Sequence, residues 1–83
     1  MNNEEVTMEN LVLKYIGNDS NGRPVYEAEN GKLFVDADPR KDRQPRLCTK
    51  LNNAFDAEPD TPVMHIKRYA DTEFVFEPER VVW

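Results

Sequence analysis

The stretch that decides the fold runs from Arg23 to Asp38 and reads RPVYEAENGKLFVDAD. Two short runs rich in β-branched and aromatic residues flank the dipeptide Asn30-Gly31, which is a strong signal for a hairpin. A two-residue type I′ turn needs positive φ at both central positions, and asparagine and glycine tolerate this best. The sequence therefore predicts a β-hairpin that turns at Asn30-Gly31. If this turn is tight, Glu29 faces Lys32 across the two strands.

A further strand is predicted on the N-terminal side of this hairpin. From Leu11 to Ile16, apolar residues fall on both faces of an extended chain, which is typical of a central strand covered on both sides. The next six residues, 17–22, are all turn-forming and predict a loop. With the hairpin, this strand predicts a three-stranded meander from Leu11 to Asp36.

The chain after the hairpin begins with a charged segment. Residues 39–45 lack apolar side chains and carry a proline at each end, which predicts an exposed, mobile loop. Two interpretations of the next segment remain open. Apolar residues at helical spacing favour one or two helical turns from Thr49 to Asp56, whereas the low helix propensity of Asn52-Asn53 favours a strand from Leu47 to Thr49 followed by a loop.

The C-terminal part predicts a second hairpin. Residues 58–62 contain two prolines and predict a turn. The alternating patterns of Val63–Tyr69 and Glu73–Glu77 predict two strands joined by a turn. Residues 80–83 either add a last strand or dock their apolar side chains over the end of a barrel formed by the other strands.

The predicted fold is a small, mainly β domain. The 83 residues suit one domain, and the eight aromatic residues support a small core. We expect a flexible tail at residues 1–8 and a single domain at residues 9–83. The domain is a small antiparallel sheet or a partly open barrel of five to six strands, with at most one short helix. Exposed strand edges could pair two chains, so the oligomeric state stays open.

Composition excludes several classes of protein. The longest apolar runs have three residues, and a membrane span needs about 20, so we expect no membrane contact. The acidic stretch MNNEEVTMEN at the N-terminus lacks the apolar region of a signal peptide. A single cysteine, Cys48, excludes an internal disulfide, and the sequence predicts a cytoplasmic protein.

Charge alternates in blocks along the chain, with acidic segments at 1–38 and 51–83 around a basic segment at 39–50. The net charge of −5 argues against general affinity for nucleic acid, which depends on clustered positive charge. The basic segment is either a solvated loop or a loop that contacts phosphate or protein, and it contains no aromatic residue on which a base could stack. Its candidate binding residues, the basic loop, are Arg40, Lys41, Arg43, Arg46 and Lys50.

A second candidate surface follows the hairpin. Its carboxylates could form an acidic edge that engages a basic partner by imitating the charge of nucleic acid. The alternative is that they provide solubility and protect an edge strand from pairing. The residues of this acidic edge are Glu27, Glu29, Asp36 and Asp38.

No motif predicts catalysis, a metal site or a cofactor. Residues 56–60 carry alternating carboxylates like the start of an EF-hand calcium loop, but Thr61 stands where that loop needs glycine. Cys48 and His65 are the single cysteine and the single histidine, which is too few for a zinc site. Cys48 and His65 could in principle form a catalytic dyad, but no nucleophile motif surrounds Cys48. We therefore expect a protein that is not an enzyme and that has no cofactor and no metal.

Several stretches between residues 22 and 66 carry a resemblance. They are GRPVYE at 22–27, ENGKLFVD at 29–36, the step LCT at 47–49 with Asn52-Asn53, and FDAEPDTP at 55–62. In these stretches the chain resembles small domains of the large polyvalent proteins of phages and conjugative elements. The resemblance implies an accessory role on a mobile element, directed at host or rival defence systems, and it carries over no catalytic residue.

The function that we expect from the sequence is that of a non-enzymatic accessory or binding module acting through contact with a protein partner. Two alternatives remain open. One is an acidic inhibitor or nucleic-acid mimic of a host or rival defence protein. The other is contact with nucleic acid through the basic loop at residues 40–50.

Overall fold

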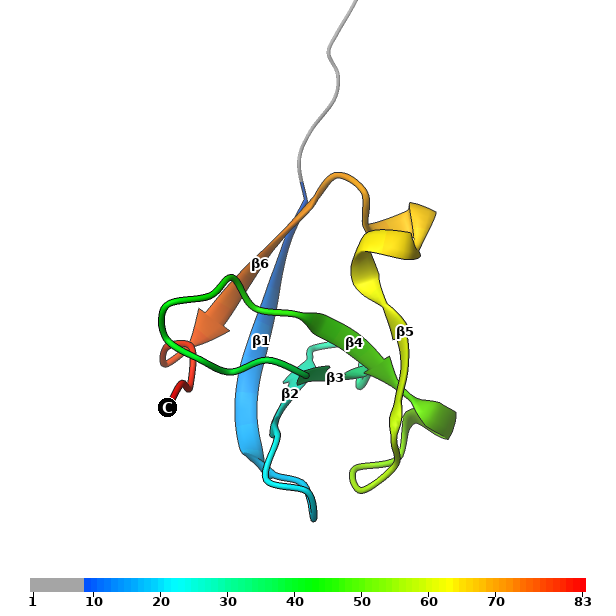
Figure 1. The fold of residues 1–83 in the computed structure, drawn as a ribbon. Helices are drawn as coiled ribbons and strands as arrows, with labels where there is room; N and C mark the ends of the chain where they lie inside the picture. The colour runs from blue at the N-terminus through cyan, green and yellow to red at the C-terminus, as the bar shows by residue number, and fades with distance from the viewer. Residues whose placement is uncertain (1–8) are drawn as a thin grey trace, which may run out of the picture.

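The computed structural model describes residues 9–83 and confirms the mainly β class (Figure 1). Six strands form one mixed sheet in the order β5-β4-β3-β2-β1-β6, which is not closed into a barrel. The strands are β1 Glu9–Asn18, β2 Pro24–Ala28, β3 Leu33–Asp36, β4 Leu47–Lys50, β5 Pro59–Pro62 and β6 Thr72–Glu77. The helices of the described residues are short 3-10 turns, η1 Leu51–Asn53, η2 Val63–His65 and η3 Lys67–Tyr69. The tail predicted at residues 1–8 lies outside the described residues.

The hairpin and the three-stranded meander are confirmed, because β2 pairs antiparallel with both β1 and β3. The predicted two-residue type I′ turn at Asn30-Gly31 is wrong. The Ala28 amide donates to the carbonyl of Lys32 at 2.9 Å, and the Gly31 amide donates to the carbonyl of Ala28 at 2.9 Å. Gly31 has a φ of 84°, whereas Asn30 has no positive φ. The loop therefore has three residues, a type I turn followed by a glycine bulge, and Lys32 lies opposite Ala28 instead of Glu29.

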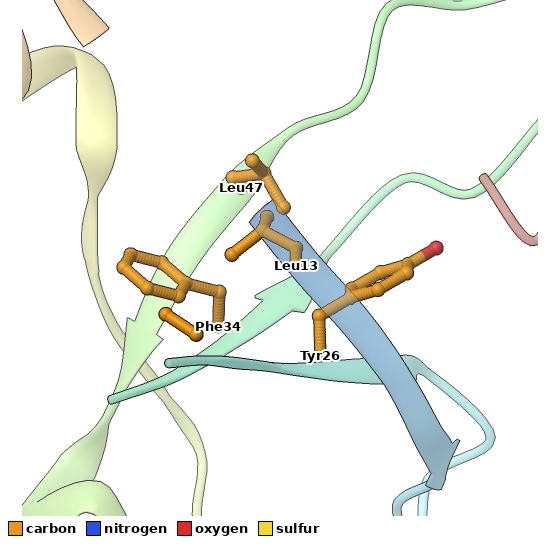
Figure 2. Packing of buried hydrophobic residues seen from close by; sticks show 5 residues of the cluster. Leu13, Tyr26, Phe34 and Leu47 are labelled. Carbon is orange, nitrogen blue, oxygen red and sulfur yellow. The ribbon is translucent and has the colours of Figure 1, made fainter. Parts of the chain in front are cut away.

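The sheet curls, and its concave face encloses the main core. The residues at the centre of this core are Leu13, Tyr26, Ala28, Phe34 and Leu47. Figure 2 shows the side chains of Leu13 and Leu47 between the rings of Phe34 and Tyr26. A flat sheet would hold β3 and β6 about 14 Å apart, since two strands lie between them. The ring centroids of Phe34 on β3 and Phe74 on β6 are 5.7 Å apart, which the curl makes possible.

A smaller cluster covers the convex face of the same strands. Val25, Val35 and Cys48 are buried there, and the half-buried ring of Phe55 packs against them. Phe55 belongs to the loop after β4, which crosses this face. Gly17 adopts a φ of 134° at an irregularity in β1, directly beneath the ring of Phe55. Phe55 and its loop therefore cover part of the convex face.

The segment after Leu47 follows the strand alternative and not the helical one. β4 is followed by the single turn η1, in which Asn52 and Asn53 both have a φ of 54°. This left-handed conformation interrupts a regular helix. The side-chain amide of Asn53 donates to the carbonyl of Gly31 at 2.9 Å, and its oxygen accepts from the amide of Leu33 at 2.7 Å. Asn53 therefore fixes the loop against the start of β3.

The strand predicted at Val63–Tyr69 is wrong, because this segment forms η2 and η3. Val63, Ile66 and Tyr69 are half-buried, and the residues between them are exposed. This spacing of three matches the three residues per turn of a 3-10 helix, so the apolar side chains share one face of the segment.

The second predicted hairpin is also wrong. β6 confirms the strand predicted at 73–77, but it pairs in parallel with β1, with Leu11 opposite Phe74. β4 pairs with β3 on one side and with β5 on the other, and β5 occupies the residues where a turn was predicted. Its two prolines are tolerated because β5 is an edge strand, where a missing N–H need not interrupt a ladder.

The strand predicted at Leu11–Ile16 is confirmed as part of β1, but it is not covered on both sides. Ile16 is 43 % exposed and Val12 is half-buried, so the convex side of β1 is only partly covered. The last residues, 80–83, dock instead of forming a strand, and the amide of Val81 donates to the Tyr26 hydroxyl at 2.9 Å. None of the helices in the described part of the chain has the length and apolar character of a membrane span.

Candidate binding surfaces

The residues of the basic loop divide into exposed and internal ones. Lys50 is internal, since its side chain is fully buried at the end of β4. Its ammonium donates to Oδ2 of Asp19 at 2.6 Å and to the carbonyl of Ala57 at 2.6 Å. Lys50 is therefore not available to an external anion. The four exposed residues of the loop are Arg40, Lys41, Arg43 and Arg46.

Asp19 is the centre of a buried ionic cluster that the sequence analysis did not identify. Besides Lys50, its carboxylate accepts hydrogen bonds from the backbone amides of Asn21 and Arg23 and from the Arg23 guanidinium at 2.9 Å. Burial opposes ionisation, but the hydrogen bonds from Lys50 and Arg23 outweigh it and lower the pKa of Asp19 from 3.8 to about 2. The cluster joins the loop after β1 to β4, so it stabilises the fold and presents no surface.

The residues of the acidic edge also divide into exposed and internal ones. β3 is not an edge strand, because β2 and β4 flank it. Asp36 is fully buried. Asp38 accepts two hydrogen bonds from the Arg40 guanidinium, at 2.8 and 3.1 Å, and this interaction lowers the pKa of Asp38. Glu27 and Glu29 remain exposed.

Arg80 holds the basic loop in place from the inside. Its guanidinium Nε lies 3.3 Å from Oδ2 of the buried Asp36. Oδ1 of Asp36 accepts two loop amides at 3.0 Å. Arg80 also donates hydrogen bonds of 2.6 to 3.3 Å to three loop carbonyls, those of Asp38, Arg40 and Arg43. Because the loop carbonyls turn toward Arg80, the loop is held by its backbone, and its cationic side chains remain exposed.

The sequence contained one signal for this arrangement. Asp36 falls on the same face of its strand as Phe34, and a carboxylate on a core-facing position needs a cation or several amides to stabilise it. No local pattern identified Arg80 as that cation, since the two residues are 44 positions apart.

The C-terminal residues lie beside the basic loop (Figure 1). The Trp83 amide donates to the carbonyl of Pro39 at 3.0 Å, and Trp83 is 56 % exposed. Within residues 9–83, no ion pair joins Lys41, Arg43 or Arg46 to a carboxylate. Trp83 and the unpaired cations of the loop are therefore both exposed, and the backbone of Trp83 contacts the loop at Pro39.

An apolar groove lies where the sheet remains open. It has a volume of about 530 Å³ and separates β6 from β4 and η2. A second hollow of about 340 Å³ adjoins it and adds Met64, which is 77 % exposed. We call the two hollows together the seam groove. Its main apolar walls are Pro45, Leu47, Pro62, Val63, Phe74 and Phe76.

The seam groove borders a free strand edge. In the described residues β6 pairs only with β1. The groove contacts β6 but not β1, so it lies along the edge of β6 that has no partner in the ladder. A groove with apolar walls beside unpaired backbone N–H and C=O groups can accept an extended peptide.

Cys48 and His65 do not form a dyad. The thiol of Cys48 belongs to the cluster on the convex face and contacts the carbonyl oxygen of Arg46 at 3.9 Å. His65 lines the seam groove beside Leu47, whose side chain lies on the opposite face of β4. Burial raises the pKa of Cys48, which disfavours the reactive thiolate.

Two of the three carboxylates of residues 56–60 act within the fold. Asp56 accepts the amide of Ser20 at 2.9 Å, and Glu58 forms an ion pair with Arg23 at 3.4 Å. Among residues 9–83, no group of three or more His, Cys, Asp or Glu is arranged to hold a metal ion.

Comparisons of the chain with protein-family models, with curated proteins and with solved structures found no match.

Proposed function

We propose that the protein is a non-enzymatic binding module that acts through protein–protein contact at the seam groove. The observation that supports this proposal is the position of an apolar groove along the free edge of β6. A segment of a partner protein that lies along β6 would satisfy the backbone groups of this edge. Alternate side chains of that segment would enter the groove, because side chains of an extended chain alternate between two faces.

Met64 gives the groove an exposed apolar contact. Its side chain stands at the rim and is 77 % exposed. Covering an apolar side chain of this size contributes roughly 1.5–3 kcal/mol, so one residue at the rim would account for a measurable share of the affinity. The polar groups around the groove, Gln44, Thr72 and Glu73, would set the orientation of the bound segment.

The resemblance of residues 22–66 to domains of polyvalent proteins favours an accessory role on a mobile element. In this proposal the partner is a protein of the host or of a rival element, and contact takes place in the cytoplasm.

A pull-down from a lysate of the encoding organism tests the proposal with two matched variants. Met64→Glu places a charge at the rim of the groove, whereas Leu51→Glu places the same charge on another exposed apolar residue, which is 47 % exposed and lies in η1. We expect the wild type and Leu51→Glu to retain the same specific protein and Met64→Glu to lose it. Equal capture by all three proteins would exclude the seam groove as the site. Failure of the wild type to retain any specific protein would contradict the proposed function itself.

A further inference from the structure

We propose that Trp83 and two cations of the basic loop, Lys41 and Arg43, bind single-stranded nucleic acid, with the indole stacked on a base and the cations on neighbouring phosphates. This proposal does not depend on the proposed function, because its residues, Lys41, Arg43 and Trp83, do not line the seam groove. The fold supplies the aromatic residue that the loop lacks in sequence, by bringing the chain end at Trp83 against Pro39.

Trp83 is both exposed and attached to the loop. Its amide is held at 3.0 Å from the carbonyl of Pro39, so the residue is fixed beside the loop, yet it is 56 % exposed. An indole in this position offers a face for stacking. Stacking of a base on an aromatic side chain contributes about 1–3 kcal/mol and tolerates any base.

The charged residues of the loop differ in whether they have an ion-pair partner. Asp36 faces Arg80 and Asp38 faces Arg40. The remaining acid of the loop, Asp42, is exposed. Lys41 and Arg43 have no carboxylate partner within residues 9–83. The planar guanidinium of an arginine matches the geometry of a phosphate group.

Hydrogen bonds to its backbone hold the loop in place. Arg80 holds three of its carbonyls by hydrogen bonds, and the Arg43 amide donates to the Arg40 carbonyl at 3.1 Å. A loop held in this way loses little conformational entropy when a ligand binds, and affinity increases accordingly.

Single-stranded nucleic acid fits these observations better than an acidic peptide does. Each nucleotide carries both an anion and an aromatic face, whereas an aspartate or glutamate carries only the anion. In a duplex the base faces are already stacked, so the indole would have no partner. Because the net charge of the chain is −5, binding depends on local contacts and must weaken with salt.

The single tryptophan of the chain gives a direct test, because its fluorescence reports only on Trp83. We expect oligothymidylate to quench this fluorescence in a saturable way at low salt. For two to three phosphate contacts, the logarithm of the binding constant should fall against the logarithm of salt concentration with a slope of about −1.4 to −2.1. The double variant Lys41→Glu/Arg43→Glu should weaken binding at least tenfold, and the control Lys67→Glu, an exposed cation in η3, should leave it unchanged.

Anisotropy of a labelled oligothymidylate extends the test to Trp83→Ala, whose binding should weaken about fivefold or more, as loss of one stacking contact predicts. Absence of quenching at low salt would overturn the proposal. Equal affinity for a duplex of the same length would overturn the stacking, and equal affinity for polyglutamate would identify an acidic protein as the better partner. Equal weakening by Lys67→Glu would show that net charge, and not this surface, determines binding.

Discussion

Replacing Asp19 with asparagine tests the buried ionic cluster that joins the loop after β1 to β4. The variant Asp19→Asn keeps the shape of the side chain and keeps one oxygen to accept the amides of Asn21 and Arg23. It replaces Oδ2, which accepts from Lys50 and from the Arg23 guanidinium, by an amide nitrogen that can only donate. Two cations then face a donor in a buried site.

The expected loss of stability follows from the pKa and from the burial. Lowering the pKa of Asp19 from 3.8 to about 2 corresponds to roughly 2 kcal/mol at neutral pH. Removing one member of a buried ion pair costs about 3–5 kcal/mol, because the other charge remains buried. Since Lys50 keeps its bond to the Ala57 carbonyl, we expect a value at the low end, about 3 kcal/mol. A domain of this length is stable by about 4–12 kcal/mol, so the loss is a large fraction.

The effect should depend on pH in a defined direction. The pKa of Asp19 is lower in the folded state than in the unfolded state. Its contribution to stability is therefore complete above the unfolded value of 3.8 and is lost as the pH falls through the folded value of about 2. Below that pH the wild-type carboxyl is also neutral, so the wild type and Asp19→Asn should approach the same stability.

Urea unfolding followed by far-ultraviolet circular dichroism at pH 7, 5, 3 and 2 measures both effects. The control is Asp60→Asn, which makes the same chemical change at an exposed position of β5 and should change stability by less than about 0.5 kcal/mol. A loss below about 1 kcal/mol for Asp19→Asn at pH 7 would refute the reasoning, because the buried pair would then contribute little. A loss of about 3 kcal/mol that persisted unchanged at pH 2 would refute the assignment to ionisation.

Two further predictions concern the loops. Arg80→Met removes the donor to three loop carbonyls, so hydrogen–deuterium exchange at residues 37–46 should become faster; unchanged exchange would show that the loop is held in another way. Asn53→Ala loses two hydrogen bonds to the backbone at the start of β3, whereas Asn52→Ala tests the same φ of 54° without them. We expect Asn53→Ala to cost about 1–3 kcal/mol more than Asn52→Ala in urea unfolding, and equal losses would contradict the role of Asn53.

The parts of the fold that could be predicted from the sequence are those with local signals. Asn30-Gly31 and the alternating runs beside it predict the meander, because a hairpin pairs neighbours in the chain. The same dipeptide suits both a two-residue turn and a three-residue turn with a glycine bulge, so the register could not be decided locally. The parallel pairing of β1 with β6 joins residues more than 60 positions apart, and no local pattern encodes such a contact.

The segment Val63–Tyr69 shows how a short apolar pattern can be ambiguous. Its residues alternate well enough to predict a strand, yet Val63, Ile66 and Tyr69 also follow the period of a 3-10 helix. The packing of Tyr69 against Phe34, with ring centroids 5.6 Å apart, favours the second arrangement. That contact depends on the curl of the sheet, which a sequence pattern does not contain.

The candidate surfaces could be predicted only in part, for a related reason. The charge pattern identified Arg40, Lys41, Arg43 and Arg46 as exposed cations, and these are exposed in the structure. It could not separate them from Lys50, whose partner Asp19 lies 31 positions away. Nor could it show which acids are neutralised internally. A linear count of charge describes a surface only after the internal pairs have been removed from it.

When these internal ion pairs are left out of the count, the alternating charge blocks describe a different surface. Asp36 and Asp38 no longer oppose the basic loop, since Arg80 and Arg40 neutralise them. One segment then serves both proposed surfaces: residues 45–47 line the seam groove, and residues 39–43 carry the cations beside Trp83. Arg80 holds this segment without contributing to the exposed positive charge of the loop. Arg80→Met should therefore weaken binding at both surfaces although every exposed cation remains. A surface that acted through its charge alone would not respond in this way.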